Sequence, residues 1–298
     1  MAPKIAEFTD EDLPSIVELL NEEYRNSNEF IPFDKERVLS QIRRRHLAIL
    51  VVKEKSKVLG IIATHLHENS EKDISWLAAI RGPKQETIES TLITEIEKDP
   101  TVKTIVTSID EKNPKINNWI KRGYELQPGF QRMSAKLNDT IPIPKIATDV
   151  ILRSLRNDEE KEFIEAVNAG FGWQRLELGD LAIWKSEDPP FDENWVQLAE
   201  IGGKIASTVV AKPDTDAIKY MHLKRGYLGP AATLPEFRNR HLASALTARS
   251  MNFLLEKGMN SVRLGTAEQN VSSNALLRSL GFRVENVRKT MRKKLKNT

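Results

Sequence analysis

Several segments of this chain occur twice, in the same order, and this internal repeat limits the possible folds more than any other feature of the sequence. Two pairs of segments are separated by 147 residues and two further pairs by 158 residues. The pairs are Phe8–Leu20 with Leu155–Val167, Lys57–Ala63 with Lys204–Val210, Trp119–Glu125 with Leu277–Arg283, and Met133–Leu137 with Met291–Leu295. The two constant offsets indicate a duplicated unit, with 11 additional residues between the matched regions of the second copy.

The repeated segments have the patterns of alternating strands and helices. The first pair reads as a strand end, an acidic helix start and an amphipathic helix, and the second pair reads as a strand entered from a turn. Between the copies, Ile141–Pro144 reads as an extended spacer because proline disfavours helix. We therefore expect two domains of one α/β plan, residues 1–138 and 150–298, joined by a linker at 139–149.

The composition is that of ordinary globular domains and excludes several classes of function. With 40% hydrophobic and 29% charged residues, 298 residues suffice for two packed cores, and a net charge of +3 is too small to indicate nucleic-acid binding. The chain has no cysteine, which excludes disulfides, thiolate zinc sites and a cysteine nucleophile. No segment has the apolar character of a signal peptide or a membrane span, so we expect a soluble cytoplasmic protein without a membrane partner.

Two smaller patterns predict no site of their own. His65 and His67 face the same side of a predicted strand without a suggested ligand partner, so no metal site is expected. The tail Val287–Thr298 is strongly basic, and we interpret it as a solvated edge strand. Its basic residues are Arg288, Lys289, Arg292, Lys293, Lys294 and Lys296.

The stretch that begins at Tyr227 is the most informative part of the chain. It reads as a short strand, a loop, and a helix that begins near Arg240 and stops at Gly258. The first N–H groups of a helix have no partner within the helix, and the helix dipole favours an anion there. Arg238 and Arg240 would add positive charge beside these groups. The pattern therefore predicts a phosphate-binding loop.

This loop resembles the pyrophosphate-binding segment of the GNAT superfamily of acetyl-CoA-dependent N-acetyltransferases. The family segment has the form Pro-Glu-aromatic-Arg-Gly-x-Gly-x-Gly/Ala, and this chain has Pro235-Glu-Phe-Arg-Asn-Arg-His-Leu-Ala243, with His241 at the central glycine. The resemblance implies acetyl-CoA as co-substrate, with the strand end beside pantetheine and the loop around the diphosphate. The strand-end residues are Ala232, Thr233 and Leu234, and the loop residues are Arg238, Asn239, Arg240, His241, Leu242 and Ala243.

A second segment, residues 270–282, resembles the GNAT pattern Asn-x-x-Ala-x-x-Leu-Tyr-x-x-x-Gly-Phe. Asn270 takes the position of the Asn and Ser273 that of the small residue, which implies contacts of both with the pantetheine arm. Leu277 replaces the Tyr that often protonates the departing CoA thiolate. Ser273, Ser279 or solvent would therefore have to supply that proton.

The resemblance implies a fold of two tandem GNAT-like α/β (α+β) domains, each with a mixed, largely antiparallel central sheet flanked by helices. In the first half, the helix that corresponds to the phosphate-binding helix would begin within Pro83–Thr87 and carry Glu86 and Glu89 in its first turn. Carboxylates at that end of a helix would repel a diphosphate. We therefore expect a degenerate first domain, and acetyl-CoA binding in the second domain only.

The acceptor amine of such a reaction must lose a proton before it attacks the thioester. Tyr227 is the first candidate base, with Glu268 and His222 as alternatives, and each could instead be a packing or capping residue. The resemblance places Trp173 where the first loop and helix of the family usually line the acceptor site. We expect an N-acetyltransferase for a primary amine of a small molecule or peptide, acting as a monomer or homodimer; the alternative is a catalytically silent acyl-CoA-binding or scaffold protein.

Overall fold

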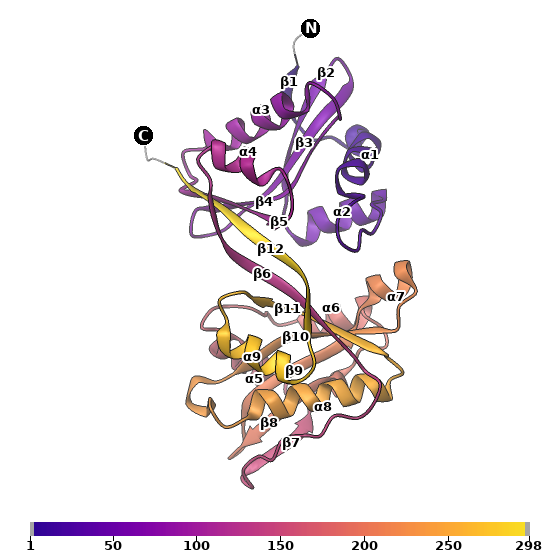
Figure 1. Ribbon diagram of the computed structural model, residues 1–298, viewed down its shortest axis with the longest axis vertical. Helices are drawn as coiled ribbons and strands as arrows, with labels where there is room; N and C mark the ends of the chain where they lie inside the picture. The colour runs from indigo at the N-terminus through magenta and orange to yellow at the C-terminus, as the bar shows by residue number, and fades with distance from the viewer. Residues whose placement is uncertain (1–2, 296–298) are drawn as a thin grey trace. The chain divides into compact units, whose positions relative to one another are not determined.

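The computed structural model describes residues 3–295 and divides into two compact units. Unit 1 consists of Met1–Phe130 and Val287–Thr298, and unit 2 consists of Gln131–Asn286. Each unit is a mixed, largely antiparallel sheet with helices packed against it, as the resemblance implies (Figure 1).

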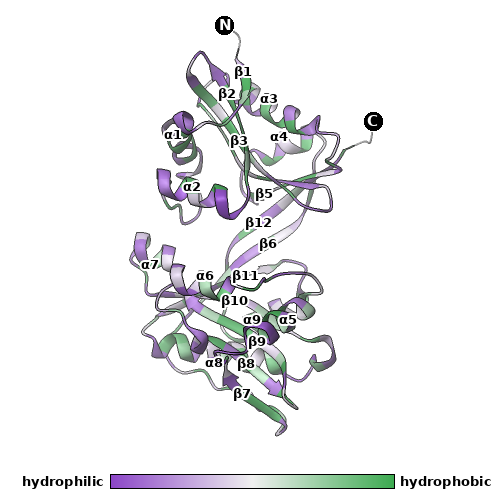
Figure 2. Ribbon diagram, turned by 180° about the vertical axis from the view of Figure 1, so that it is seen from behind, coloured by the Kyte–Doolittle hydropathy of each residue, from purple (hydrophilic) through white to green (hydrophobic). Residues whose placement is uncertain are grey.

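Unit 1 contains a sheet in the order β1-β2-β3-β4-β5-β12, antiparallel except for the parallel pair β4–β5. Alternate residues of its strands build two cores, because successive side chains of a strand point to opposite faces. Ile61 packs with α1 and α2, whereas Ile62 packs with α3. The elements are β1 (Lys4–Glu7), α1 (Leu13–Tyr24), α2 (Lys35–Arg44), β2 (Ala48–Glu54), β3 (Lys57–Leu66), β4 (Glu71–Ala79), α3 (Gln85–Glu97), β5 (Thr104–Asp110) and α4 (Ile116–Lys121). The short helix α2 is largely hydrophilic (Figure 2), and Val38 is its one buried residue.

Unit 2 repeats this plan with the strand order β11-β10-β9-β8-β7, in which only β10 and β11 are parallel. Helix α8 packs on β8, β9 and β10, and α5 packs on β9 and β10. The elements are β7 (Val150–Ser154), α5 (Glu160–Phe171), α6 (Asp180–Glu187), β8 (Val196–Ile201), β9 (Lys204–Pro213), α7 (Thr215–Met221), β10 (Arg225–Thr233), α8 (Leu242–Glu256), β11 (Ser261–Ala267) and α9 (Val271–Ser279).

The bounds of corresponding elements agree with the repeat found in the sequence. Helix α5 begins and ends 147 residues after α1, and β9 does the same relative to β3. Seven of the 11 additional residues of the second copy lengthen the connection before β10, where α7 lies. Three more lengthen the loop before α8, which has eight residues (234–241) against five (80–84) before α3. The insertion therefore enlarges the predicted phosphate loop itself.

Two long strands, β6 (Glu125–Lys136) and β12 (Arg283–Lys294), each run from one unit into the other. The limits of the compact units therefore differ from the expected domains 1–138 and 150–298, because each unit includes part of both strands.

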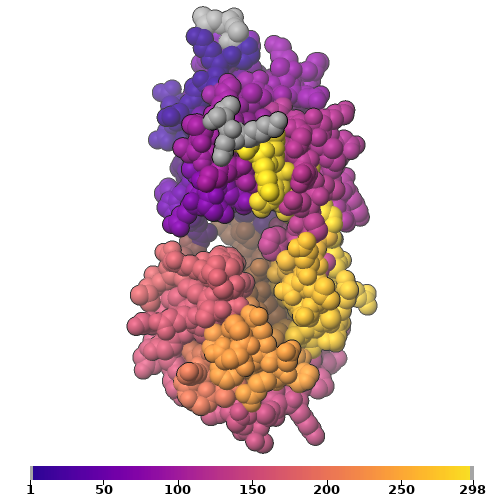
Figure 3. Space-filling model, turned by 90° about the vertical axis from the view of Figure 1, so that its left-hand side faces the viewer, coloured from indigo at the N-terminus to yellow at the C-terminus, as the bar shows by residue number. Residues whose placement is uncertain are grey.

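The basic tail is not the solvated edge strand that the sequence suggested. Its residues Arg288–Lys294 pair with Thr104–Asp110 of β5, and β12 lies between β5 and β6 in the strand order. Figure 3 shows the end of β12, in yellow, between segments of earlier residues. Carboxylates make the inner position possible, since Arg292 pairs with Glu71 at 2.7 Å and Lys293 with Glu97 at 2.9 Å. Lys296 lies outside the described residues.

Candidate functional site

The central feature of unit 2 is a separation of two neighbouring strands. Strands β10 and β11 pair only over Arg225–Tyr227 and Ser261–Arg263, although both strands continue beyond that point. A bulge in β10 accompanies the separation, because the register with β9 shifts between Leu228 and Ala231. Gly229 lies in this bulge at φ +140°, a conformation that favours glycine. Among the strands of the described residues, none therefore pairs with the second half of β10 on its β11 side.

The backbone of this open edge is available for hydrogen bonding. The N–H of Leu234 donates to the carbonyl of Ala206 at 3.0 Å, so Leu234 faces β9. Backbone groups alternate between the two sides of a strand, which turns the N–H groups of Thr233 and Ala231 toward the open side. The hydroxyl of Ser207 supports the strand from β9, since it donates to the carbonyl of Ala232 at 2.9 Å and lies 2.8 Å from the Thr233 hydroxyl.

The loop that follows β10 presents a run of unpartnered amides at the start of α8. Within residues 3–295, the structure gives no hydrogen-bond acceptor for the backbone N–H groups of residues 239–244. Asn239 and His241 have left-handed backbones, with φ of 62° and 58°. His241 thus adopts a backbone conformation that glycine favours, at a cost of about 1 kcal/mol for a side chain that remains exposed. The loop therefore keeps the backbone geometry of an anion site at a helix N-terminus.

The two arginines of the loop both bind protein oxygens and so hold the loop in place. Arg238 donates to the carbonyl of Gly170 in α5 at 3.0 Å, and to the carbonyl of Thr233 at 3.4 Å. Arg240 donates to both carboxylate oxygens of Asp149 at 2.8 Å, and this hydrogen bond lowers the pKa of Asp149. The charge of Arg240 is therefore balanced by a carboxylate, whereas Arg238 has only neutral carbonyl partners and keeps its positive charge in the loop.

The second predicted motif lies at the open end of β11. The side chain of Asn270 caps α9 by accepting from the N–H of Ser273 at 3.1 Å, and the hydroxyl of Ser273 accepts from Thr266 of β11 at 3.3 Å. Ser279 instead donates to the carbonyl of Leu276 within the helix. Leu277 is only 4% exposed and belongs to the core of unit 2.

Sequence reasoning missed Asn274, which fixes the turn between β11 and α9. Its amide nitrogen donates to the carbonyls of Ala267 and Glu268, at 3.3 and 3.0 Å, and its oxygen accepts from Gln131. A buried asparagine must have such partners, but the resemblance of residues 270–282 drew attention only to Asn270, Ser273 and Leu277. Asn274 orients the segment that carries Asn270 and Ser273.

The three candidate bases occupy different places. Tyr227 is the last residue of β10 that pairs with β11, and a Cβ built on Gly265 would lie 3.9 Å from its hydroxyl, so its ring stands where the strands separate. Glu268 directly follows β11 at its open end. His222 is exposed at the C-terminal end of α7, before the start of β10, whereas the predicted phosphate loop follows the other end of that strand. Of the three, Tyr227 is the one placed at the strand separation.

Unit 1 has the same strand separation but fills it with its own side chains. Strands β4 and β5 pair only over Glu71–Ile74 and Thr104–Thr107. Beyond that point, the N–H of Leu77 donates to the hydroxyl of Tyr24 at 3.2 Å. By strand position, Leu77 corresponds to Ala231 of β10, whose N–H faces the open edge.

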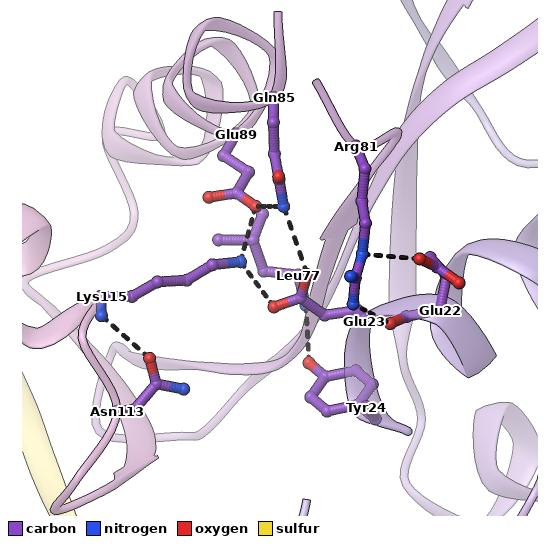
Figure 4. A network of polar contacts seen from close by, with 9 residues as sticks. All are labelled: Glu22, Glu23, Tyr24, Leu77, Arg81, Gln85, Glu89, Asn113 and Lys115. Carbon is purple, nitrogen blue, oxygen red and sulfur yellow. Dashed lines mark hydrogen bonds and ion pairs between the residues drawn. The ribbon is translucent and has the colours of Figure 1, made fainter. Parts of the chain in front are cut away.

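Charged side chains complete the filling of unit 1 (Figure 4). Lys115 points toward Glu23 and Glu89, at 2.5 and 2.9 Å, and Gln85 donates to Glu89 at 3.1 Å. Burial raises the pKa of Glu23, against the lowering effect of Lys115. Burial acts to lower the pKa of Lys115, but its hydrogen bonds to both carboxylates leave it raised. In unit 1, ion pairs through Lys115 thus join α1, α3 and the start of α4 beside the separated strands. The corresponding helices of unit 2 leave the edge of β10 open.

The described residues contain neither a metal-binding cluster nor a membrane-spanning helix. Residues 3–295 contain no group of three or more histidine, aspartate or glutamate side chains placed to hold a metal ion. Over the same residues, no helix combines the length and apolar character needed to cross a membrane.

The fold and the open strand edge place this chain among proteins that carry two copies of an acetyltransferase-type α/β fold. Residues 152–282 match the family model described as acetyltransferase (GNAT) family. The match covers less than half of the chain, and the whole chain consists of two GNAT-like folds.

Similar proteins agree with this assignment. The chain is 24% identical over 173 residues to a mycothiol acetyltransferase of Renibacterium salmoninarum; the match covers 54% of this chain and about half (49%) of that protein. A GCN5-related N-acetyltransferase from Sphaerobacter thermophilus superposes with a TM-score of 0.73 at 17% identity, covering 99% of this chain and 96% of the other. A tandem GNAT protein from the clavulanic acid biosynthesis pathway superposes with a TM-score of 0.71 at 14% identity, and the superposition covers 100% of both chains.

Proposed function

We propose that this chain transfers an acetyl group from acetyl-CoA to a primary amine of a small molecule or peptide, at the open edge of β10 in unit 2. The proposal is carried by one observation: the open strand edge and the unpartnered helix-start amides follow each other directly along the chain. An unpaired strand edge, with the N–H groups of Ala231 and Thr233 turned outward, leads directly into the unpartnered amides of residues 239–244. This sequence of donors suits an extended amide-containing chain that ends in a diphosphate.

Each part of the site has a task in this reaction. The amides of residues 239–244 would bind the diphosphate, and an outward N–H of β10 would stabilise the negative charge that develops on the thioester oxygen. The ammonium group of the acceptor first passes one proton to a base, and the neutral amine then attacks the thioester carbon. The new C–N bond forms as the C–S bond breaks, and the nitrogen gives up a second proton, which the departing CoA thiolate or solvent takes up. Tyr227 is the first candidate base because it stands at the strand separation, and Glu268 and His222 remain alternatives. Ser273 could donate a hydrogen bond to the thiolate.

A catalytically silent acyl-CoA-binding protein is the second candidate function. The observation that favours it is Leu277, a buried leucine at the position of the usual proton donor. The two candidates share the cofactor site and differ in whether acetyl transfer to an amine occurs at all.

The decisive experiment measures acetyl-CoA binding by calorimetry on wild type and on a matched pair of variants, Ser244→Glu and Ser244→Gln. Ser244 lies in the first turn of α8. A carboxylate there opposes a diphosphate, whereas the amide of similar shape does not. We expect Ser244→Glu to weaken binding about tenfold or more and Ser244→Gln to change it little. Equal binding by both variants would contradict the proposed site, and an amine screen that follows thiol release separates the two candidate functions.

A further inference from the structure

An exposed group of aromatic rings with a cation stacked on it follows α5 in unit 2. The rings of Phe171 and Trp173 lie 5.7 Å apart, edge to face, and the guanidinium of Arg175 lies 5.8 and 5.6 Å from their centres. Trp173 is 55% exposed and Phe171 38%. We call Phe171, Trp173 and Arg175 the aromatic platform.

The platform adjoins the open edge of β10. A Cβ built on Gly170 would lie 2.9 Å from the Cβ of Ala232 and 3.2 Å from the backbone nitrogen of Thr233, so this end of α5 touches the strand directly. Phe171 is the next residue along the chain. It also occupies the position of Tyr24 in unit 1, the residue whose hydroxyl binds the N–H of Leu77 on the corresponding strand.

The aromatic residue of unit 1 that corresponds to Phe171 is packed against other rings. Tyr24 contacts Phe33, with ring centres 6.2 Å apart, and Phe33 contacts the buried Trp76 at 5.8 Å. The residues of unit 1 at the repeat positions of Trp173 and Arg175 are Asn26 and Asn28. The platform is therefore specific to the unit whose strand edge is open, where exposed rings need a ligand or partner to gain by burial.

Among residues 3–295, no carboxylate forms an ion pair with the cation of the platform. The described residues supply no hydrogen-bond acceptor or carboxylate for the guanidinium of Arg175, in contrast to Arg238 and Arg240. A guanidinium placed over aromatic rings without a carboxylate partner suits a carboxylate or phosphate, which it can bind with two parallel hydrogen bonds. Its stacking also lowers the entropic cost of binding.

We infer that the acceptor of the acetyl transfer is an amine that carries a flat apolar group and an oxyanion, the first bound by Trp173 and the second by Arg175. This inference rests on the proposed function and specifies its substrate class. The oxyanion could belong to the carboxylate of an amino acid or peptide, or to a phosphate ester. Both sources have the same charge and geometry toward Arg175, so matched substrates must distinguish them.

The test compares wild type, Arg175→Met and the control Arg283→Met, which removes another exposed arginine of unit 2. Amines are supplied as matched pairs: the standard amino acids and phenylalanine-containing dipeptides as free acids and as C-terminal amides, and O-phosphotyramine against tyramine. Acetyl transfer is followed by release of free thiol, and acetyl-CoA binding is measured separately by calorimetry.

We expect wild type to prefer the anionic member of a pair by about tenfold in kcat/KM, mainly through KM. Arg175→Met should lose this preference and Arg283→Met should keep it, while all three bind acetyl-CoA equally. The substrate pair that shows the preference tells whether Arg175 binds a carboxylate or a phosphate. The inference is overturned if acetyl-CoA binds but no anionic amine is preferred, or if Arg175→Met keeps the preference. If wild type does not bind acetyl-CoA, the proposed function itself is overturned.

Discussion

The two units of this chain share one strand separation and use it in opposite ways. In unit 2 the edge of β10 is open and leads to free amides at the start of α8. In unit 1 the corresponding N–H of Leu77 is bonded to Tyr24, and Lys115 joins Glu23 to Glu89 across the same region. The comparison teaches that a few side chains at helix ends suffice to fill an open strand edge with an internal polar network.

One position shows the difference most clearly. The repeat offset of 147 aligns Glu23 of α1 with Gly170 of α5. Gly170 brings α5 against β10 and offers its carbonyl to Arg238, whereas Glu23 extends a carboxylate toward Lys115. The offset of 158 similarly aligns Lys115 with Ser273. Exchanging these residues between units is therefore the most direct way to break the comparison.

The largest effect is expected from Gly170→Glu, which transfers the unit 1 residue into unit 2. Its Cβ would lie 2.9 Å from Ala232 and 3.2 Å from backbone of Thr233, so the strand must move. We expect a loss of about 3 kcal/mol in the free energy of unfolding of unit 2, and loss of acetyl-CoA binding, by urea denaturation and calorimetry. Gly170→Ala serves as the control that separates steric overlap from charge. Normal binding by the Glu variant would show that this contact does not shape the site.

Lys115→Met should have the next largest effect, confined to unit 1. It leaves Glu23 and Glu89 close together, with side chains only 16% and 12% exposed, and without their cation. We expect a loss of about 3 kcal/mol at neutral pH and unchanged acetyl-CoA binding.

The pH dependence of this loss provides a second check. The folded-state pKa of Glu23 is already raised by burial in wild type, and removing Lys115 raises it further. A carboxyl with a raised folded pKa binds its proton more tightly in the folded state, so stability falls as pH rises through the interval between the unfolded and folded pKa values. The variant should therefore approach wild-type stability as pH falls below that interval, and a loss independent of pH would argue against buried carboxylates as the cause.

A smaller effect is expected from Tyr24→Phe, which gives unit 1 the aromatic residue of unit 2. The hydroxyl that accepts from Leu77 is lost, leaving that N–H without its partner. The expected loss is about 1 kcal/mol in the free energy of unfolding. Hydrogen exchange at the Leu77 amide should accelerate while the amides of β9 remain unchanged; equal protection in both proteins would contradict the assigned hydrogen bond.

The smallest effect is expected from His241→Gly, which restores the glycine of the family pattern. The backbone already has φ of 58°, so the substitution should stabilise unit 2 by no more than about 1 kcal/mol and alter acetyl-CoA affinity little. His222→Gly, at φ 57° and outside the loop, is a matched control that should give a similar gain. A large change in affinity for His241→Gly alone would mean that the imidazole contacts the diphosphate.

Much of this architecture could be predicted from the sequence, because it depends on patterns that repeat along the chain. The duplication, the start of α3 at Gln85 and the strand–loop–helix from β10 to α8 follow from such patterns and are confirmed. The partners of Arg238 and Arg240 could not be predicted, since Gly170 and Asp149 lie far from them in sequence. The inner position of β12 was missed for the same reason, because strand pairing between distant segments leaves no local signal.

The filling of unit 1 was foreseen only in part. We expect Glu86 and Glu89 to repel a diphosphate from the helix start. Glu89 is instead buried and accepts hydrogen bonds from Lys115 and Gln85, so it helps to fill the strand separation. The roles of Tyr24 and Glu23 depend on the exact end of α1, which a periodic pattern does not fix.

The stoichiometry of acetyl-CoA binding tests the contrast between the units most directly. Calorimetry on wild type, Ser244→Glu and Lys115→Met should give one site per chain, weakened about tenfold or more by Ser244→Glu and unaffected by Lys115→Met. Two sites per chain, or a single site that responds to Lys115→Met and not to Ser244→Glu, would contradict the account.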